Sequence, residues 1–125
     1  MASPDVPDEV LTRVRHIAWT LPEAEASVDR FAHAFRIRRR VFLHLLAVGG
    51  PGGRRVPLAV CRADPDERQA LIAIGHPYFA PRSGRDRLGV VLEDGTNWDE
   101  LAELVTESYR LLAPARLVTL LDSRG

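Results

Sequence analysis

The chain has no lysine. All seventeen of its basic residues are arginines, and seventeen Asp and Glu residues bring the formal net charge to zero. With a pI near 6.9, the protein lacks the bulk positive charge that draws strongly basic domains to nucleic acid. Any recognition of an anion therefore depends on how the arginines are distributed over the surface.

Cysteine and long apolar runs are nearly absent as well. A single cysteine, Cys61, cannot form an internal disulfide, and within an apolar segment it is expected to be a small buried hydrophobe. The apolar run from 41 to 48, broken only by His44, is far shorter than the roughly 20 residues that cross a bilayer. The N-terminus carries no secretory pattern. We expect a soluble, cytoplasmic protein with no membrane contact.

Signatures of catalysis are missing too. The sequence has no Gly-x-Ser-x-Gly, no Gly-x-Gly-x-x-Gly, and no Lys-Ser or Lys-Thr after the glycine-rich run 49–53. No nucleophile can be paired with a base, so we expect a protein that is not an enzyme and needs no cofactor. The length of 125 residues suits one domain over 1–125, with loose tails at 1–5 and 118–125, and we expect a monomer.

Apolar spacing predicts the order of the elements. A helix is expected over 6–20, strands over 31–37, 41–48 and 56–61, and a second helix over 64–74. Strands at 78–79 and 88–93 follow, and a last helix begins after Asn97 and ends before Pro114. Arg38 and Arg39 form a two-residue hairpin turn. The order α-β-β-β-α-β-β-α with short connections predicts a two-layer α+β fold, its antiparallel sheet covered by helices on one face.

Short strings in this order resemble the MmcQ/YjbR family, and they span most of the chain: Ile17-Ala18-Trp19-Thr20-Leu21-Pro22, Ala34-Phe35-Arg36-Ile37, Asp66-Glu67-Arg68, Pro77-Tyr78-Phe79, Asn97-Trp98-Asp99-Glu100-Leu101 and Ser108-Tyr109-Arg110-Leu111. The resemblance implies the double-wing α+β fold and a DNA-binding role, and it implies no catalytic residues. The chain departs from the family pattern at Arg38-Arg39, where a glycine turn is common, and over 82–87, where relatives often have an aromatic-rich loop.

Two histidines are weak candidates for a metal. If the turn is Arg38-Arg39 and the pairing is regular, His33 lies directly opposite His44 on one face of the sheet. Two imidazoles can share a metal, but neither Cys61 nor a carboxylate is placed to supply a third ligand. We therefore expect an ordinary cross-strand pair and no metal.

The arginines are unevenly distributed. Residues 28–62 contain eight arginines and one acid, whereas residues 93–107 contain six acids and no base. Arginine forms bidentate contacts with phosphate, and loops on one sheet can follow a duplex backbone. We predict that duplex DNA is bound through its phosphates by arginines of the hairpins and of one later loop: Arg36, Arg38, Arg39, Arg40, Arg54, Arg55, Arg82, Arg85 and Arg87.

A protein partner is the alternative. The segment 41–48 has apolar residues on both faces of the expected strand, among them Val41, Phe42, Leu43 and Leu46. One face would pack against the helices, and the other would be free to bind a partner. The fold implied by the resemblance is similar to that of small secretion chaperones, which bind an extended segment of another protein. This alternative predicts an interaction module that uses an apolar sheet face.

Overall fold

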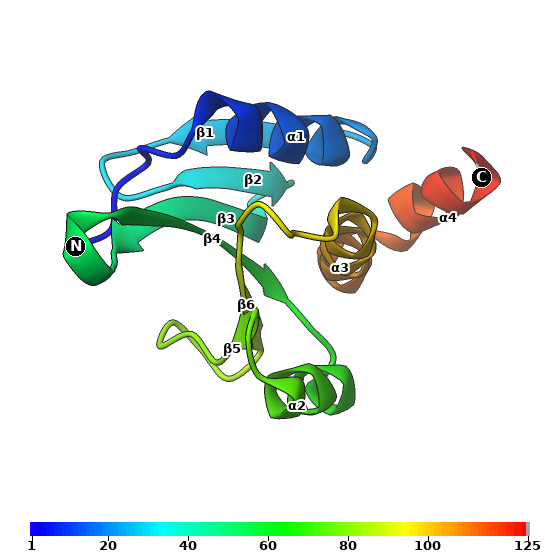
Figure 1. Ribbon diagram of the computed structural model, residues 1–125. Coiled ribbons are helices and arrows are strands. Elements are labelled where there is room, and N and C mark those ends of the chain that lie inside the picture. The colour runs from blue at the N-terminus through cyan, green and yellow to red at the C-terminus, as the bar shows by residue number, and fades with distance from the viewer. Residues whose placement is uncertain (125) are drawn as a thin grey trace.

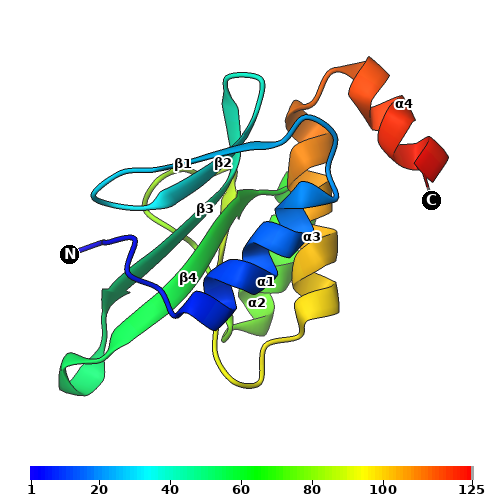
Figure 2. The same cartoon turned by 90° about the horizontal axis from the view of Figure 1, so that it is seen from above.

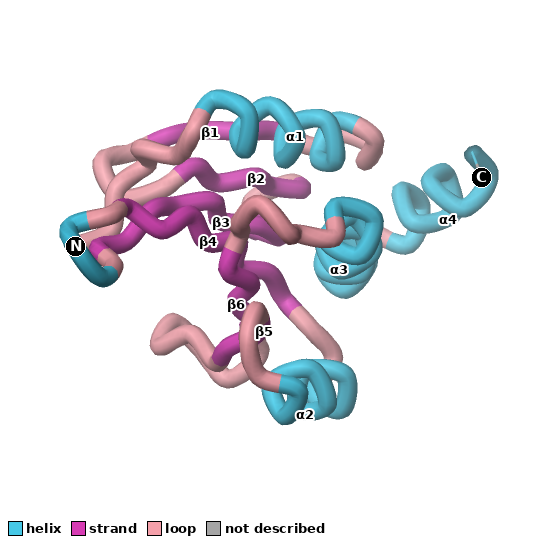
Figure 3. The backbone as a smooth tube through the Cα atoms, viewed as in Figure 1, coloured by secondary structure: helices cyan, strands magenta, loops and turns pink. Residues whose placement is uncertain are grey.

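The structure is a computed structural model that describes residues 1–124. Its helices are α1 (Asp8–Trp19), α2 (Pro65–Ile74), α3 (Trp98–Leu112) and α4 (Ala115–Arg124), with a short 3-10 turn η1 (Pro51–Gly53). Its strands are β1 (Glu25–Val28), β2 (His33–Ile37), β3 (Arg40–Gly49), β4 (Arg55–Arg62), β5 (Tyr78–Phe79) and β6 (Arg87–Val91). All neighbouring strands are antiparallel, and they form one sheet in the order β1-β2-β3-β4-β6-β5 (Figures 1 and 3).

The predicted α+β class and the order of the predicted elements are confirmed. The structure adds β1, which lies between the predicted helix 6–20 and the predicted strand 31–37, and α4. All four residues of β1 are exposed, so this edge strand has no alternation of buried and exposed residues by which the sequence could have revealed it.

The expected tails at 1–5 and 118–125 need correction. Ser3 forms backbone hydrogen bonds with Ala47 in both directions, which ties the first residues to β3. Residues 115–124 form helix α4, whose Leu117 is fully buried. Arg116 of α4 forms an ion pair with Glu23. α4 extends away from the sheet beyond the end of α3 (Figures 1 and 2).

The core lies between the sheet and the helices. Phe35, Leu43, Leu45 and Leu88 point from the strands into one buried cluster together with Val105 and further apolar residues of α1 and α3. α3 crosses β3 and β4, and α1 runs along the β1–β2 side (Figure 1). Burial of this face supplies the main driving force for folding. Within residues 1–124, no helix has the length and apolar character needed to cross a bilayer.

A β-bulge interrupts the β2–β3 hairpin. Arg36 pairs with Val41, but Phe35 pairs with Leu43, so Phe42 is an additional residue on β3. Ser108 on α3 stabilises this irregularity: its buried Oγ donates to the carbonyl of Phe42 at 2.6 Å and accepts from the backbone N–H of Arg62 at 2.8 Å. Beyond the bulge, each residue of β2 therefore pairs with the residue of β3 that is one position later than in a regular hairpin. This shift by one residue places the other set of alternating β3 side chains opposite β2.

Candidate nucleic-acid interface

One face of the sheet is not covered by a helix. Side chains alternate along each strand, and the core residues Phe35, Leu43 and Leu88 mark the helix-covered face. The residues between them, Ala34, His44, Val60 and Gly89, form a cross-strand row on the opposite face. At the end of this row, the ring of Phe79 lies over Gly89: a Cβ at position 89 would be 2.3 Å from its Cζ.

Three arginines lie on this uncovered face around His44. Arg36 is between the core residues Phe35 and Ile37 on β2 and so points away from the core. Arg62 and Arg87 are directly paired between β4 and β6, next to the core residues Cys61 and Leu88. All three arginines and His44 are half-buried. We call this group, Arg36, His44, Arg62 and Arg87, the arginine face.

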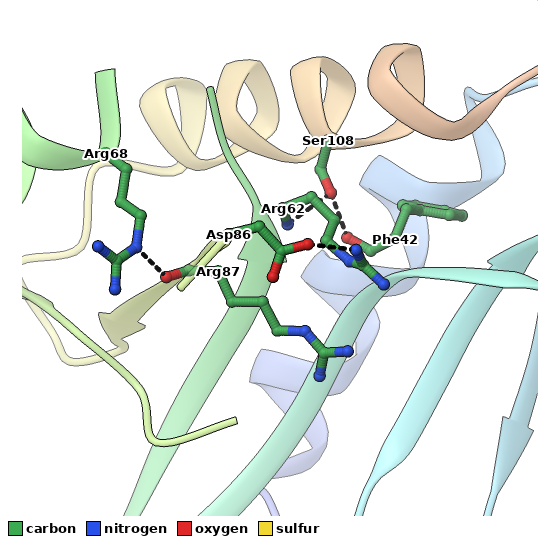
Figure 4. Close-up of polar contacts among 6 residues, drawn as sticks. All are labelled: Phe42, Arg62, Arg68, Asp86, Arg87 and Ser108. Carbon is green, nitrogen blue, oxygen red and sulfur yellow. Dashed lines mark hydrogen bonds and ion pairs between the residues drawn. The ribbon is translucent and has the colours of Figure 1, made fainter. Parts of the chain in front are cut away.

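The arginines of this group differ in how their charge is compensated. Arg62 forms an ion pair with Asp86, and Arg36 donates to the hydroxyl of Ser27. Within residues 1–124, the side chain of Arg87 has no ion-pair or hydrogen-bond partner, although its Nε is buried. Figure 4 shows the side chains of Arg62 and Arg87 extending from the strands on the side away from α3, where Ser108 lies.

The backbone of Arg87 is held in place independently of its side chain. Arg68 of α2 donates through its Nε to the carbonyl of Arg87 at 2.7 Å, a contact that Figure 4 also shows. The N–H of Arg62 is fixed by Ser108 at 2.8 Å. The helix layer therefore positions two of the arginines through their main chains and leaves their guanidinium groups on the other face.

The environment of His44 is strongly cationic. Burial of its ring is the main cause that lowers the pKa of His44, and the positive charges of Arg87, Arg36 and Arg62 lower it further. The negative charge of Asp29 opposes this shift. His44 is therefore neutral at neutral pH, and a bound anion would favour its protonation.

The predicted pairing of His33 with His44 is wrong. The bulge at Phe42 shifts the register, so that His44 pairs with Ala34 and His33 pairs with Leu45. The two histidines are therefore on opposite faces of the sheet, and His33 contacts the carbonyl of Pro4 at 3.0 Å. In the described part of the chain, no group of three or more His, Cys, Asp or Glu residues is arranged to hold a metal ion.

The structure places the nine predicted arginines in two separate regions. Arg36 and Arg87 belong to the arginine face; Arg38, Arg39 and Arg40 lie at the adjacent β2–β3 turn, and Arg82 and Arg85 are exposed in the segment before β6. Arg54 and Arg55 lie at the other end of β3 (Figure 2), about 30 Å from the β2–β3 turn for a ten-residue strand.

Three of these arginines have intramolecular partners, and the partner of Arg36 is Ser27, as described above. Arg55 donates to the carbonyls of Met1 and Ala47 and to the hydroxyl of Ser3, so it holds the N-terminal segment. Arg38 forms an ion pair with Glu23 at 3.2 Å. The carboxylate of Glu23 thus partly compensates the charge of Arg38, whereas Arg55 is held by neutral groups.

The acids of residues 93–107 lie away from the arginine face. α3 packs on the covered face, and its Glu100, Glu103 and Glu107 line a groove of about 430 Å³ together with Glu67 of α2. The sheet thus separates an acidic helix side from a face that carries three arginines. Asp29 and Asp86 are acids that remain near those arginines.

A cleft of about 950 Å³ lies between the start of α1, the β3–β4 hairpin and the segment before α3. Arg54, Arg55 and Asp94 line it, and other charged side chains of the cleft are paired. His76 contacts Glu93 at 2.6 Å, and Arg13 lies 3.9 Å from Glu9 and 5.3 Å from the ring centre of Trp98. The cleft therefore carries charges of both signs, with Glu9, Glu93 and Asp94 among its lining residues.

Cys61 is confirmed as a buried core residue. Its side chain belongs to the apolar cluster, and burial raises the pKa of its thiol to about 12. A thiol with so high a pKa is protonated at neutral pH and is therefore a poor nucleophile.

Sequence reasoning did not place His44 and Arg62 in the candidate interface. The run of charge over 28–62 includes Arg62, but only the pairing of Arg62 with Arg87 shows that both point to one face. For His44, the period of two along β3 could have indicated the uncovered face, because His44 lies between the apolar residues Leu43 and Leu45.

A known protein family matches most of the chain. The model of the YjbR family matches residues 19–111, which include every strand, α2 and all of α3 except its last residue, but only Trp19 of α1. No curated protein is similar enough to the chain to be matched.

Proposed function

The chain belongs to the YjbR family, and on that premise and its charge arrangement we propose that it is a small, non-catalytic domain that binds duplex DNA. The phosphate backbone contacts the arginine face, and the arginines of the β2–β3 turn and of the segment before β6 extend the contact. The protein acts as a monomer in the cytoplasm. The single free thiol of Cys61 is consistent with that reducing compartment.

The observation that carries this proposal is the separation of charge by the sheet. Arg36, Arg62 and Arg87 share the face without helices, whereas the acids of α3 line the groove on the helix side. The sheet therefore lies between a duplex bound to the arginine face and the acidic groove, which reduces the repulsion between the phosphates and these acids. Charge on one face raises the local concentration of a polyanion even when the net charge of the protein is zero.

The expected binding is largely independent of sequence. Arginines on a sheet face and on loop tips bind phosphate oxygens, and such contacts set position and orientation without reading bases. The dependence of log K on log salt then counts the phosphates contacted, with a slope of about −0.9 for each.

The test is a titration of a fluorescently labelled 20-base-pair duplex by anisotropy at several salt concentrations. The double variant Arg36→Gln/Arg87→Gln removes two charges from the arginine face. We expect it to weaken binding and to reduce the salt slope by about two. The variant Arg15→Gln/Arg54→Gln removes two charges from exposed residues on α1 and at the far hairpin, and it should bind as the wild type does.

A third variant defines the extent of the interface. Arg39→Gln/Arg40→Gln removes two exposed charges next to the turn, and a reduced slope would place the turn in contact with the duplex. No binding by the wild type even at low salt would contradict the proposed function. Equal loss of affinity in all three variants would show attraction by general charge and contradict the assignment to the arginine face.

A protein partner is a second candidate function. Leu46 and Leu58 are paired on the uncovered face and are half-buried without a covering helix. They lie on the same face as the arginines, so a partner segment bound there would compete with DNA. Substitution of Leu46 by Ser should leave the affinity for the duplex unchanged if DNA alone uses the face.

A further inference from the structure

The side chain of Arg87 is unusual because one of its hydrogen-bond donors is buried without an acceptor. Its Nε is buried, yet within residues 1–124 it donates to no acceptor. A Cβ at Gly84 would lie 3.6 Å from that Nε and 3.7 Å from Cδ, so the segment before β6 lies against the arginine stem. Buried donors are almost always satisfied, and a fixed guanidinium with free donors is suited to hold an anion.

His44 lies between the strands that carry the arginines. β3, which contains it, is flanked by β2 with Arg36 and by β4 with Arg62, and Arg87 follows on β6. His44 and these arginines point to the same face, and Asp29 is the acid that acts on the ring of His44. Arg62 is engaged with Asp86 and Arg36 with Ser27, so Arg87 is the arginine of the group whose side chain has no hydrogen-bond partner within residues 1–124.

We infer that Arg36, His44 and Arg87 form a binding site for a single phosphate group on the uncovered face of the sheet. The inference deepens the proposed function and rests on it for the source of the ligand, because a backbone phosphate of the duplex would occupy this site. Arg87 and Arg36 supply paired N–H donors to the phosphate oxygens. His44 donates through one ring N–H when it is neutral and through two when it is protonated, and it then also carries a positive charge.

Anion binding at this site is coupled to protonation of His44. In the free protein, burial and the charges of Arg87, Arg36 and Arg62 lower the pKa of His44, and Asp29 alone opposes them. A bound anion compensates the arginines and raises that pKa, so anion binding takes up a proton. By linkage, the affinity for the anion then increases as the pH falls from neutral.

The experiment follows the ring C–H resonances of His44 by NMR in the full chain. The probes are inorganic phosphate, sulfate and the 20-base-pair duplex, at pH 5.5, 6.5 and 7.5. Sulfate keeps two charges across this range and so separates protonation of His44 from that of the ligand. We expect saturable shifts of the His44 resonances, and an affinity for sulfate that is about three- to tenfold higher at pH 5.5 than at pH 7.5.

Two variants make the assignment specific. Arg87→Gln should reduce the affinity for sulfate about tenfold, because it removes the guanidinium whose donors have no partner within residues 1–124. Arg54→Gln, which removes an exposed charge at the far hairpin, should leave it unchanged. The resonances of the exposed His76 serve as an internal reference, and an unchanged unfolding temperature of Arg87→Gln shows that the fold is retained.

The outcomes separate this inference from the proposed function. If the duplex binds through the arginine face but neither duplex nor sulfate shifts His44, the phosphate site is contradicted while the function stands. If sulfate and phosphate shift His44 but the duplex does not bind, the site stands for free phosphate compounds and the DNA-binding function is contradicted. If Arg87→Gln binds sulfate as tightly as the wild type, the assignment to Arg87 is overturned.

Discussion

The two faces of the sheet are built from the same strands, yet they have different roles. On the covered face, Phe35, Leu43 and Leu88 are almost fully buried and pack against α1 and α3. On the uncovered face, one residue along each strand, Arg36, His44 and Arg87 are half-buried and charged or titratable. Alternate residues therefore separate stability from recognition within a single layer of the fold.

The faces are nevertheless connected through the main chain. Ser108 of α3 is fully buried on the covered side, and it fixes the N–H of Arg62, whose side chain lies on the other face. Arg68 of α2 similarly fixes the carbonyl of Arg87. A substitution in the helix layer can thus change the arginine face without contacting it, and the following predictions test how independent the two faces are.

The largest effect is expected for Ser108→Ala. The variant leaves the carbonyl of Phe42 and the N–H of Arg62 without their partner, and each unsatisfied buried group costs about 1–3 kcal/mol. We expect unfolding in urea to show a loss of about 2–4 kcal/mol. Ser123→Ala, which removes an exposed contact of α4 with the carbonyl of Leu120, should change stability by less than about 0.5 kcal/mol. A loss as small for Ser108→Ala would show that the bulge does not depend on this serine.

A smaller effect is expected on the uncovered face, for Gly89→Ala. The added Cβ would overlap the ring of Phe79, which lies on a two-residue edge strand and can be displaced outward. We expect a loss of about 1–2 kcal/mol by urea denaturation, at the lower end of the cost of overpacking. In a Phe79→Ala background the same substitution should cost less than about 0.5 kcal/mol, because the overlap is gone. Additive losses would contradict this explanation.

The smallest effect is a dependence of stability on pH. The folded protein lowers the pKa of His44, mainly through burial and then through Arg87, so the unfolded chain binds a proton more readily. Stability should therefore decrease as the pH falls from 7 toward 5, and His44→Gln should reduce that decrease. Asp29, whose pKa is lowered mainly by the N–H groups of Phe31 and Ala32, affects stability only at lower pH. The exposed His76→Gln is the control, and equal slopes for all three proteins would contradict the role of His44.

Much of the architecture could be predicted from local sequence. The apolar stripes of α1 and α3, the cap at Asn97 and the two-residue turn at Arg38-Arg39 depend on residues close in the chain. These patterns predicted the class, the order of the elements and the burial of Cys61. The family strings were confirmed by the match over residues 19–111.

Which charged residues of different strands share a face was decided only by the tertiary structure. The bulge at Phe42 is stabilised by Ser108, which is 66 residues away in the chain, and it places His33 and His44 on opposite faces. Arg62 and Arg87 meet because β4 pairs with β6 across the intervening α2 and β5. Hydrophobic spacing determines that a segment is a strand, but register depends on contacts between distant segments, and a shift of one residue exchanges the two faces.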